Sequence, residues 1–112
     1  MVQDLSKKEK SNRLVSVPFD NGFHFKTENG LYTGLTATSM MDFVEKLRVV
    51  DINSILFHYP RGDFQKWVED TLGDKELSNR LCFVKTGLSG ESLRKKLLKI
   101  TQKRTNELKQ ES

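Results

Sequence analysis

The stretch that most constrains the fold is residues 56–77, because it contains residues that end a helix at two places. Pro60 and Gly62 stop any helix that enters from the N-terminal side, and Gly73 stops the next one. Between these breaks, residues 63–71 carry apolar side chains at the spacing of one helix face. We therefore expect a short helix between two turns, buried through these side chains: Phe64, Trp67, Val68 and Leu72.

The same kind of apolar spacing predicts helices on both sides of this stretch. Thr38 or Ser39 caps a helix that runs to about residue 50, and residues 52–58 form one or two further helical turns. Asp74 caps a helix whose buried face carries Leu77, Leu81 and Val84.

Residues 23–35 predict a β-hairpin, because phenylalanines alternate with polar residues at the period of a strand. The dipeptide Asn29-Gly30 favours a type I′ turn, which needs positive φ at both central residues. Residues 31–35 supply the return strand, with Gly34 as a candidate bulge. A lone hairpin is marginally stable in water, so we expect it to pack on the helices.

These elements fit one domain of the α+β class, since a chain of 112 residues builds a single core. We expect the hairpin, with room for a third strand over residues 14–17, to pack on about four to five short helices. Residues 1–13 are polar without periodicity and predict a mobile tail. The domain then spans residues 14–108, and residues 109–112 fray from its end.

Charge is segregated along the chain, whose formal net charge is +4. Residues 85–112 hold eight basic and three acidic side chains, whereas residues 14–84 hold seven basic and ten acidic ones. The basic segment predicts a helix capped by Ser89, with an inward stripe of Leu93, Leu97 and Ile100. Outside that stripe stand the candidate phosphate contacts Arg94, Lys95, Lys96, Lys99 and Lys103. They would bind nucleic acid without sequence preference, or they form an ordinary solvated face.

Composition also argues against several classes of protein. Cys82 is the only cysteine, so no intrachain disulfide can form, and its apolar neighbours predict a buried thiol. No apolar run approaches the roughly 20 residues of a membrane span, and the N-terminus lacks the apolar segment of a signal peptide. We therefore expect a cytoplasmic protein with no membrane partner and no cofactor.

His58, Arg61 and Asp63 form a polar cluster in the turn before the central helix. They could bind an anion or act as an acid–base pair, because histidine titrates near neutral pH. In the structural alternative, Asp63 is the N-cap, Arg61 pairs with it or with a carbonyl group, and His58 is a hydrogen-bonded anchor. A metal site of His24, His58 and an Asp matches no known ligand spacing, so we expect His24 to face solvent from its strand.

The order of these anchors resembles a family of short archaeal and bacterial proteins grouped as a domain of unknown function. The shared signature reads FHxxRGDFxxW and then LGDxxL, here at residues 57–67 and 72–77, after an F-x-F pattern at residues 23–25. Ser78 stands where the family often has Ala, and Pro60 is unusual in the turn. Related segments look like accessory parts of larger regulatory proteins. The resemblance therefore implies no activity, and it favours a regulatory or protein-interaction module.

No catalytic constellation follows from the sequence. The adjacent carboxylates Glu69 and Asp70 point in different directions on a helix, and the loop at residues 86–92 lacks the Lys-Ser/Thr pair of a phosphate-binding loop. We therefore expect no catalytic, cofactor-binding or metal-binding residues and a non-enzymatic interaction module. Its site is expected around His58, Arg61, Asp63 and Trp67. Sequence-tolerant nucleic-acid binding through the basic C-terminal helix is the alternative.

Overall fold

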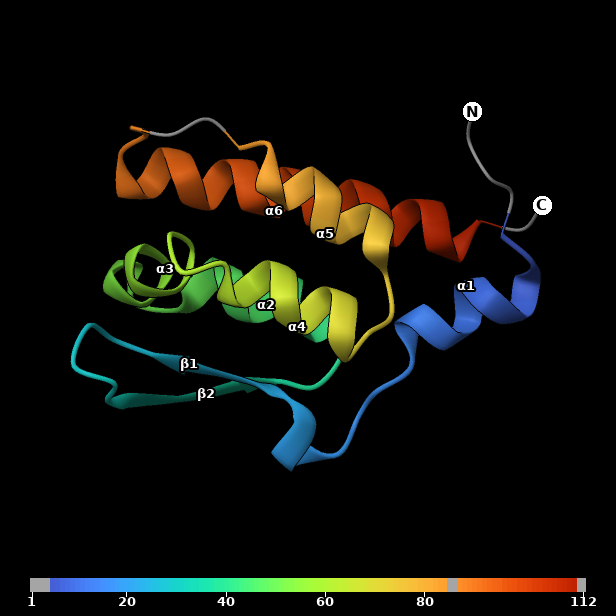
Figure 1. The fold of residues 1–112 in the computed structure, drawn as a ribbon, viewed down its shortest axis with the longest axis horizontal. Helices are drawn as coiled ribbons and strands as arrows, with labels where there is room; N and C mark the ends of the chain where they lie inside the picture. The colour runs from blue at the N-terminus through green and yellow to red at the C-terminus, as the bar shows by residue number, and fades with distance from the viewer. Residues whose placement is uncertain (1–4, 85–86, 111–112) are drawn as a thin grey trace.

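The computed structural model describes residues 5–84 and 87–110, whose elements stack in layers (Figure 1). The hairpin of β1 (Phe23–Lys26) and β2 (Tyr32–Ala37) forms one outer layer. The middle layer contains α2 (Met40–Val49), α3 (Ile52–His58) and α4 (Asp63–Asp70). The opposite outer layer contains α5 (Lys75–Cys82) and α6 (Gly90–Lys109), and α1 (Lys7–Leu14) lies beside the C-terminal end of α6.

This architecture confirms the α+β class and the hairpin packed on helices. The described residues contain six α-helices, more than expected, because part of the presumed polar tail is helical. Ser6 Oγ accepts a hydrogen bond from Glu9 N at 3.1 Å, and Glu9 Oε1 accepts one from Ser6 N at 2.9 Å. This capping box starts α1, so residues 7–13 form a helix in place of the expected tail. Residues 1–4 and 111–112 lie outside the described part of the chain.

The segment between α1 and β1 adds no third strand to the sheet in the described part of the chain. Val17 N donates to Thr38 O at 2.7 Å, but Pro18 follows and has no N–H with which to extend the pairing. A 3-10 turn, Phe19–Asn21, then leads into β1. No helix in residues 5–84 or 87–110 is long and apolar enough to cross a bilayer.

The hairpin forms where expected, although its turn is of a different type. Gly30 N donates to Thr27 O at 2.8 Å, and Thr27 N donates to Leu31 O at 2.9 Å. Gly30 has a φ of 73° and Asn29 is not left-handed, so a three-residue loop replaces the type I′ turn. Gly34, with a φ of 91°, lies where the strand register shifts, which confirms the irregularity expected there.

Aromatic side chains form the centre of the core, between the hairpin and the middle layer. The rings of Phe23 and Phe25 meet those of Phe43, Phe64 and Trp67, with neighbouring centroids 4.8 to 6.1 Å apart. Trp67 is 8% exposed, which confirms its expected burial. The hairpin is therefore held to α2 and α4 mainly through ring contacts.

Helix α5 departs from expectation at two residues. Cys82 is exposed, because it lies about 100° around the helix from the buried Leu81 and away from the stripe that continues to Val84. Asp74 stands at the N-cap position, but its side chain makes no capping hydrogen bond. Its side chain is only 1% exposed and points instead into an ion-pair cluster.

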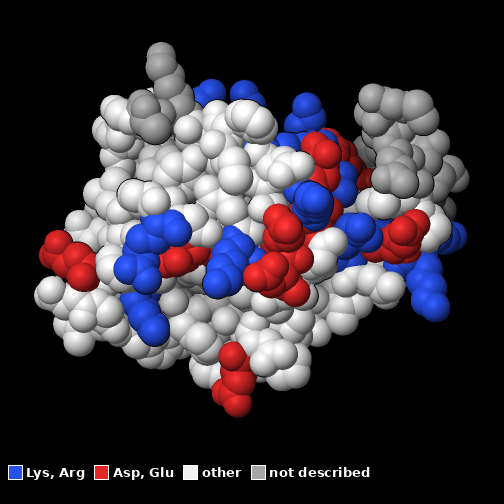
Figure 2. Space-filling view, in the orientation of Figure 1, with Lys and Arg blue, Asp and Glu red and all other residues white. Residues whose placement is uncertain are grey.

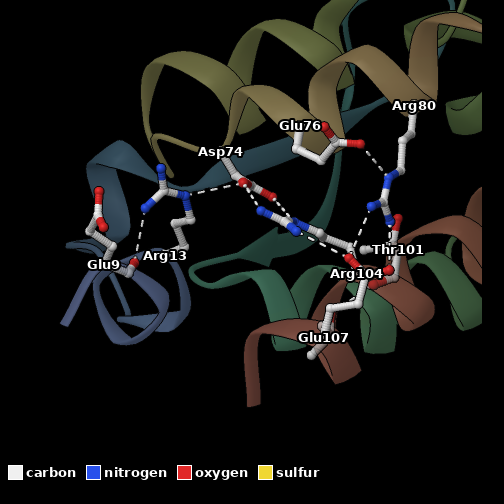
Figure 3. Close-up of polar contacts among 9 residues, drawn as sticks. Glu9, Arg13, Asp74, Glu76, Arg80, Thr101, Arg104 and Glu107 are labelled. Atoms are coloured by element: carbon white, nitrogen blue, oxygen red, sulfur yellow. Dashed lines mark hydrogen bonds and ion pairs between the residues drawn. The ribbon is translucent and has the colours of Figure 1, made fainter. Parts of the chain in front are cut away.

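This cluster ties α5 to α6 and α1 (Figure 3). Arg104 donates to the Asp74 carboxylate from Nε and Nη2, each at 2.8 Å, and Arg13 donates to it from Nε at 3.1 Å. Arg104 Nη1 also donates to Glu107, whose carboxylate accepts two further hydrogen bonds from Arg80 at 2.9 and 3.0 Å. Helix α1 is thereby joined to α5 and α6, which are distant from it in sequence, through buried or half-buried charges.

Candidate functional site

His58, the last residue of α3, joins three elements. Its Nε2 accepts a hydrogen bond from the main-chain N–H of Lys26 at 2.8 Å, and its Nδ1 lies 2.8 Å from Asp63 Oδ2. Because only an unprotonated ring nitrogen accepts from an N–H, the imidazole is neutral and carries its proton on Nδ1. The side chain is buried with both nitrogens bonded, which matches the anchor role proposed for it in the structural alternative.

Asp63 is the first residue of α4 and not its N-cap, which corrects the sequence expectation. Gly62 holds the N-cap position with a φ of 75°, a conformation that costs glycine little. The Asp63 carboxylate therefore lies over the preceding turn, where Oδ2 accepts from His58 and from Arg61 Nε at 3.0 Å. The structure thus brings His58, Arg61 and Asp63 together in direct contact.

The electrostatics of this triad favour a neutral imidazole beside a charged carboxylate. Burial lowers the pKa of His58 below its usual value, against the opposing effect of the Asp63 carboxylate. Burial alone would raise the pKa of Asp63, but hydrogen bonds from His58 and Arg61 outweigh it, and the net shift is downward. The triad therefore keeps one protonation state through neutral pH.

The neutral His58 predicts a loss of stability as the pH falls below about 6.5, the usual pKa of an unfolded histidine. In that range the unfolded chain binds a proton that the folded His58 resists, so acid favours unfolding. Urea denaturation between about pH 7 and about pH 5.5 should show this loss, at up to about 1.4 kcal/mol per pH unit. His58→Gln should give a flatter profile over the same range. Stability that stays constant or rises toward acid would contradict the assignment.

A hollow of about 440 Å³ opens beside the triad, between β1, the hairpin turn and the α3–α4 turn. Besides the triad, its lining includes Phe23, His24, Lys26 and Phe57. The Arg61 guanidinium lies over the Phe57 ring with Cζ 4.7 Å from the centroid. Sequence reasoning missed Lys26 and Phe57 as site residues. Their only local signals were a polar strand position and an aromatic residue next to His58.

Trp67 does not line this hollow, although it was expected at the same site. Its indole N–H donates to Asn21 O at 2.9 Å, and its ring packs into the aromatic core. It borders a smaller hollow of about 250 Å³ that also touches Asp63. The structure therefore brings three of the four expected residues to the larger hollow.

The histidines are not arranged as metal ligands. His58 has no free lone pair, and His24 Nδ1 lies 2.8 Å from Thr36 Oγ1. His24 is half-buried, lines the hollow and packs against Phe19, so it is less exposed than expected. In the described part of the chain, no three His, Cys, Asp or Glu side chains lie close enough to share a metal ion.

The expected phosphate contacts on α6 fall into two groups. Lys95, Lys96, Lys99 and Lys103 are exposed and make no hydrogen bond or ion pair within residues 5–84 and 87–110. Arg94 is already bonded, because it donates to Leu47 O at 2.6 Å and to Glu91 at 3.0 Å. Figure 2 shows a face on which basic and acidic side chains alternate, with further basic side chains at the upper margin where α6 runs. The unpaired lysines are therefore a distinct feature of one side of α6.

Comparison with known proteins identifies the family of this chain but no individual relative. A search of the curated proteins and of the solved structures finds no match to this chain. Residues 20–112 match the model of DUF5752, described as a family of unknown function, so the match spans most of the chain and excludes α1. The chain therefore belongs to the DUF5752 family.

Proposed function

We propose that this protein is a non-enzymatic regulatory module that binds a segment of a partner protein in the hollow beside His58. The observation that carries the proposal is the hollow itself, where the exposed cations Lys26 and Arg61 lie beside the half-buried ring of Phe57. In keeping with the family resemblance, the setting we propose is the prokaryotic cytoplasm.

The contacts of His58 support binding over catalysis. A general base needs a free ring nitrogen within reach of the substrate proton. Here Nδ1 already faces Asp63, and Nε2 accepts from the Lys26 N–H. The ring therefore fixes the spacing between β1, α3 and α4, which are the walls of the hollow.

The size and lining of the hollow support a peptide ligand. Its volume of about 440 Å³ lies within the range of about 300 to 1,000 Å³ that is typical of ligand sites. Arginine and aromatic side chains, as at Arg61 and Phe57, are enriched where proteins bind one another. An extended segment with one or two side chains in the hollow would bury both.

The test is selection of binders from a displayed library of random peptides, followed by affinity measurement on purified protein. Phe57→Ser should weaken binding of the selected peptides by about tenfold or more, because it removes an aromatic ring from the lining of the hollow. Phe83→Ser is the matched control, since Phe83 is 87% exposed and lies at the end of α5, outside the hollow. If no peptide is selected, or if both variants bind equally well, the proposal is wrong.

Nucleic-acid binding through α6 is a second candidate, favoured by the four exposed lysines without partners. Side chains on a helix at intervals of three or four residues lie on one face, so Lys95, Lys99 and Lys103 can follow a phosphate backbone. Arg94 is not needed in this candidate, because its guanidinium is already bonded to Leu47 and Glu91.

This candidate predicts salt-dependent, sequence-tolerant binding. If about three phosphates are neutralised, log K should fall with log salt with a slope of roughly −2 to −3. Titrations of labelled duplex and single-stranded oligonucleotides measure it, with a Lys95→Glu and Lys99→Glu double variant expected to abolish binding. A Lys66→Glu and Lys75→Glu double variant, on α4 and α5, is the control because it changes the net charge by the same amount. Dissociation constants weaker than about 10⁻⁴ M at low salt, or an unaffected double variant, would rule the candidate out.

A further inference from the structure

The guanidinium of Arg61 is fixed on two sides and open on the others. Nε donates to Asp63 Oδ2 at 3.0 Å, and the group lies over the Phe57 ring with Cζ 4.7 Å from its centroid. The side chain is nevertheless 60% exposed. Its two terminal nitrogens make no hydrogen bond within the described residues, and they border the hollow. Arg61 therefore presents unused donors from a position already set by its neighbours.

Such an arginine is suited to oxygen anions. The parallel N–H groups of a guanidinium match the two oxygens of a carboxylate or of a phosphate. Because Asp63 and Phe57 already restrict the side chain, binding costs less conformational entropy than it would for a free surface arginine.

Lys26 supplies a second positive charge at the same hollow. Its main-chain N–H is held by His58 Nε2, so its position on β1 is fixed relative to the α3–α4 turn. Its ammonium group is exposed and makes no ion pair in the part of the chain that the structure describes. Asp63 is the one acidic residue among the described residues that line the hollow, and its carboxylate already accepts from both His58 and Arg61. The hollow thus holds two cations, Arg61 and Lys26, and Asp63 pairs only with the first of them among the described residues.

We infer that the hollow binds an oxyanion carried by a peptide, a carboxylate or a phosphate, through the terminal nitrogens of Arg61 with Lys26 beside it. The inference rests on the proposed function, because it names the chemistry of the segment that this function requires. A peptide fits better than a nucleic acid here, because the hollow offers one anchor point and not the row of cations that a phosphate backbone needs.

The first measurement is an NMR titration of ¹⁵N-labelled protein with inorganic phosphate and with acetate, against chloride at equal ionic strength. We expect saturable shifts of the Arg61 Nε–H and Lys26 N–H signals with phosphate, acetate or both. The anion that binds more tightly identifies the anchoring side chain of the peptide: phosphate indicates a phosphorylated residue, and acetate indicates an acidic one. Arg61→Gln should weaken binding by about tenfold or more, as for a lost hydrogen bond between charged groups. Arg61→Lys keeps the positive charge but loses the paired N–H donors of the guanidinium, so it should also bind the anion more weakly. Lys75→Gln, outside the hollow, should leave binding unchanged.

The second measurement separates this inference from the proposed function. Selected peptides should carry an acidic or a phosphorylated residue. The same peptide with that acidic side chain replaced by its amide, or without the phosphate group, should bind at least about tenfold more weakly. Peptides that bind without an anion would overturn the inference and leave the interaction module standing. Anions that bind at Arg61 while no peptide is selected would remove the proposed function and keep the anion site. If neither anion gives saturable shifts, or if Arg61→Gln binds as well as the unaltered protein, the oxyanion site does not exist.

Discussion

Asp74→Ala is expected to lower the free energy of unfolding by about 3–5 kcal/mol, among the largest effects of any single change. The Asp74 side chain is 1% exposed and accepts two hydrogen bonds from Arg104 at 2.8 Å each (Figure 3). Without it, the Arg104 guanidinium, which is 10% exposed, keeps among the described residues only its hydrogen bond to Glu107. A largely buried charge with its main partner removed is costly, and urea denaturation near neutral pH measures the loss.

Two controls identify burial as the cause. Arg13→Ala removes a more exposed member of the same cluster, 22% exposed, and should cost only about 0–1 kcal/mol. Replacing Asp74 and Arg104 together by leucine should restore most of the stability, because neither charge is then left buried alone. If Asp74→Ala costs no more than Arg13→Ala, the cluster does not contribute in the way its geometry indicates.

Local sequence signals predicted the elements of this fold well where the structure also depends on local contacts. Ser39 and Ser89 cap α2 and α6 as expected, and each cap accepts a hydrogen bond from the N–H three residues on. The hairpin was predicted, whereas its turn type was not, because Asn29-Gly30 fits either turn and only the φ of Asn29 separates them. A local signal was also overlooked, since Ser6 and Glu9 have the spacing of a capping box.

Contacts between residues that are far apart in the sequence could not be predicted from such local signals. Asp74 looked like an ordinary N-cap, because its partner Arg104 is 30 residues away and nothing in the sequence links the two. In the candidate site too, contacts between residues close in sequence were predicted and contacts between distant residues were not. His58 and Asp63 lie five residues apart and were grouped correctly, whereas Lys26 reaches them only because β1 packs beside α3. The hollow could therefore not be outlined before the fold was known.

Trp67→Ala is the second large expected effect, a loss of about 3–5 kcal/mol in the free energy of unfolding. The ring is 8% exposed and packs against Phe23 and Phe43, with centroids 5.8 and 5.6 Å away. Truncation removes most of a large side chain from the centre of the core, and the surrounding rings cannot collapse fully into the space. Before any substitution, the tryptophan emission should be blue-shifted and poorly quenched. A red-shifted, readily quenched emission would contradict the burial.

Trp67→Phe distinguishes the cavity from the lost hydrogen bond. The indole N–H donates to Asn21 O, which belongs to an exposed residue and can bond to water instead, so the bond itself should contribute only about 0.5–1.5 kcal/mol. Phenylalanine keeps much of the ring volume and should therefore cost clearly less than alanine. Phe23 also contacts His58, with centroids 4.7 Å apart, and it lines the hollow. A cavity at Trp67 should consequently loosen β1 and weaken ligand binding by Lys26 and Arg61, even though Trp67 does not touch the hollow.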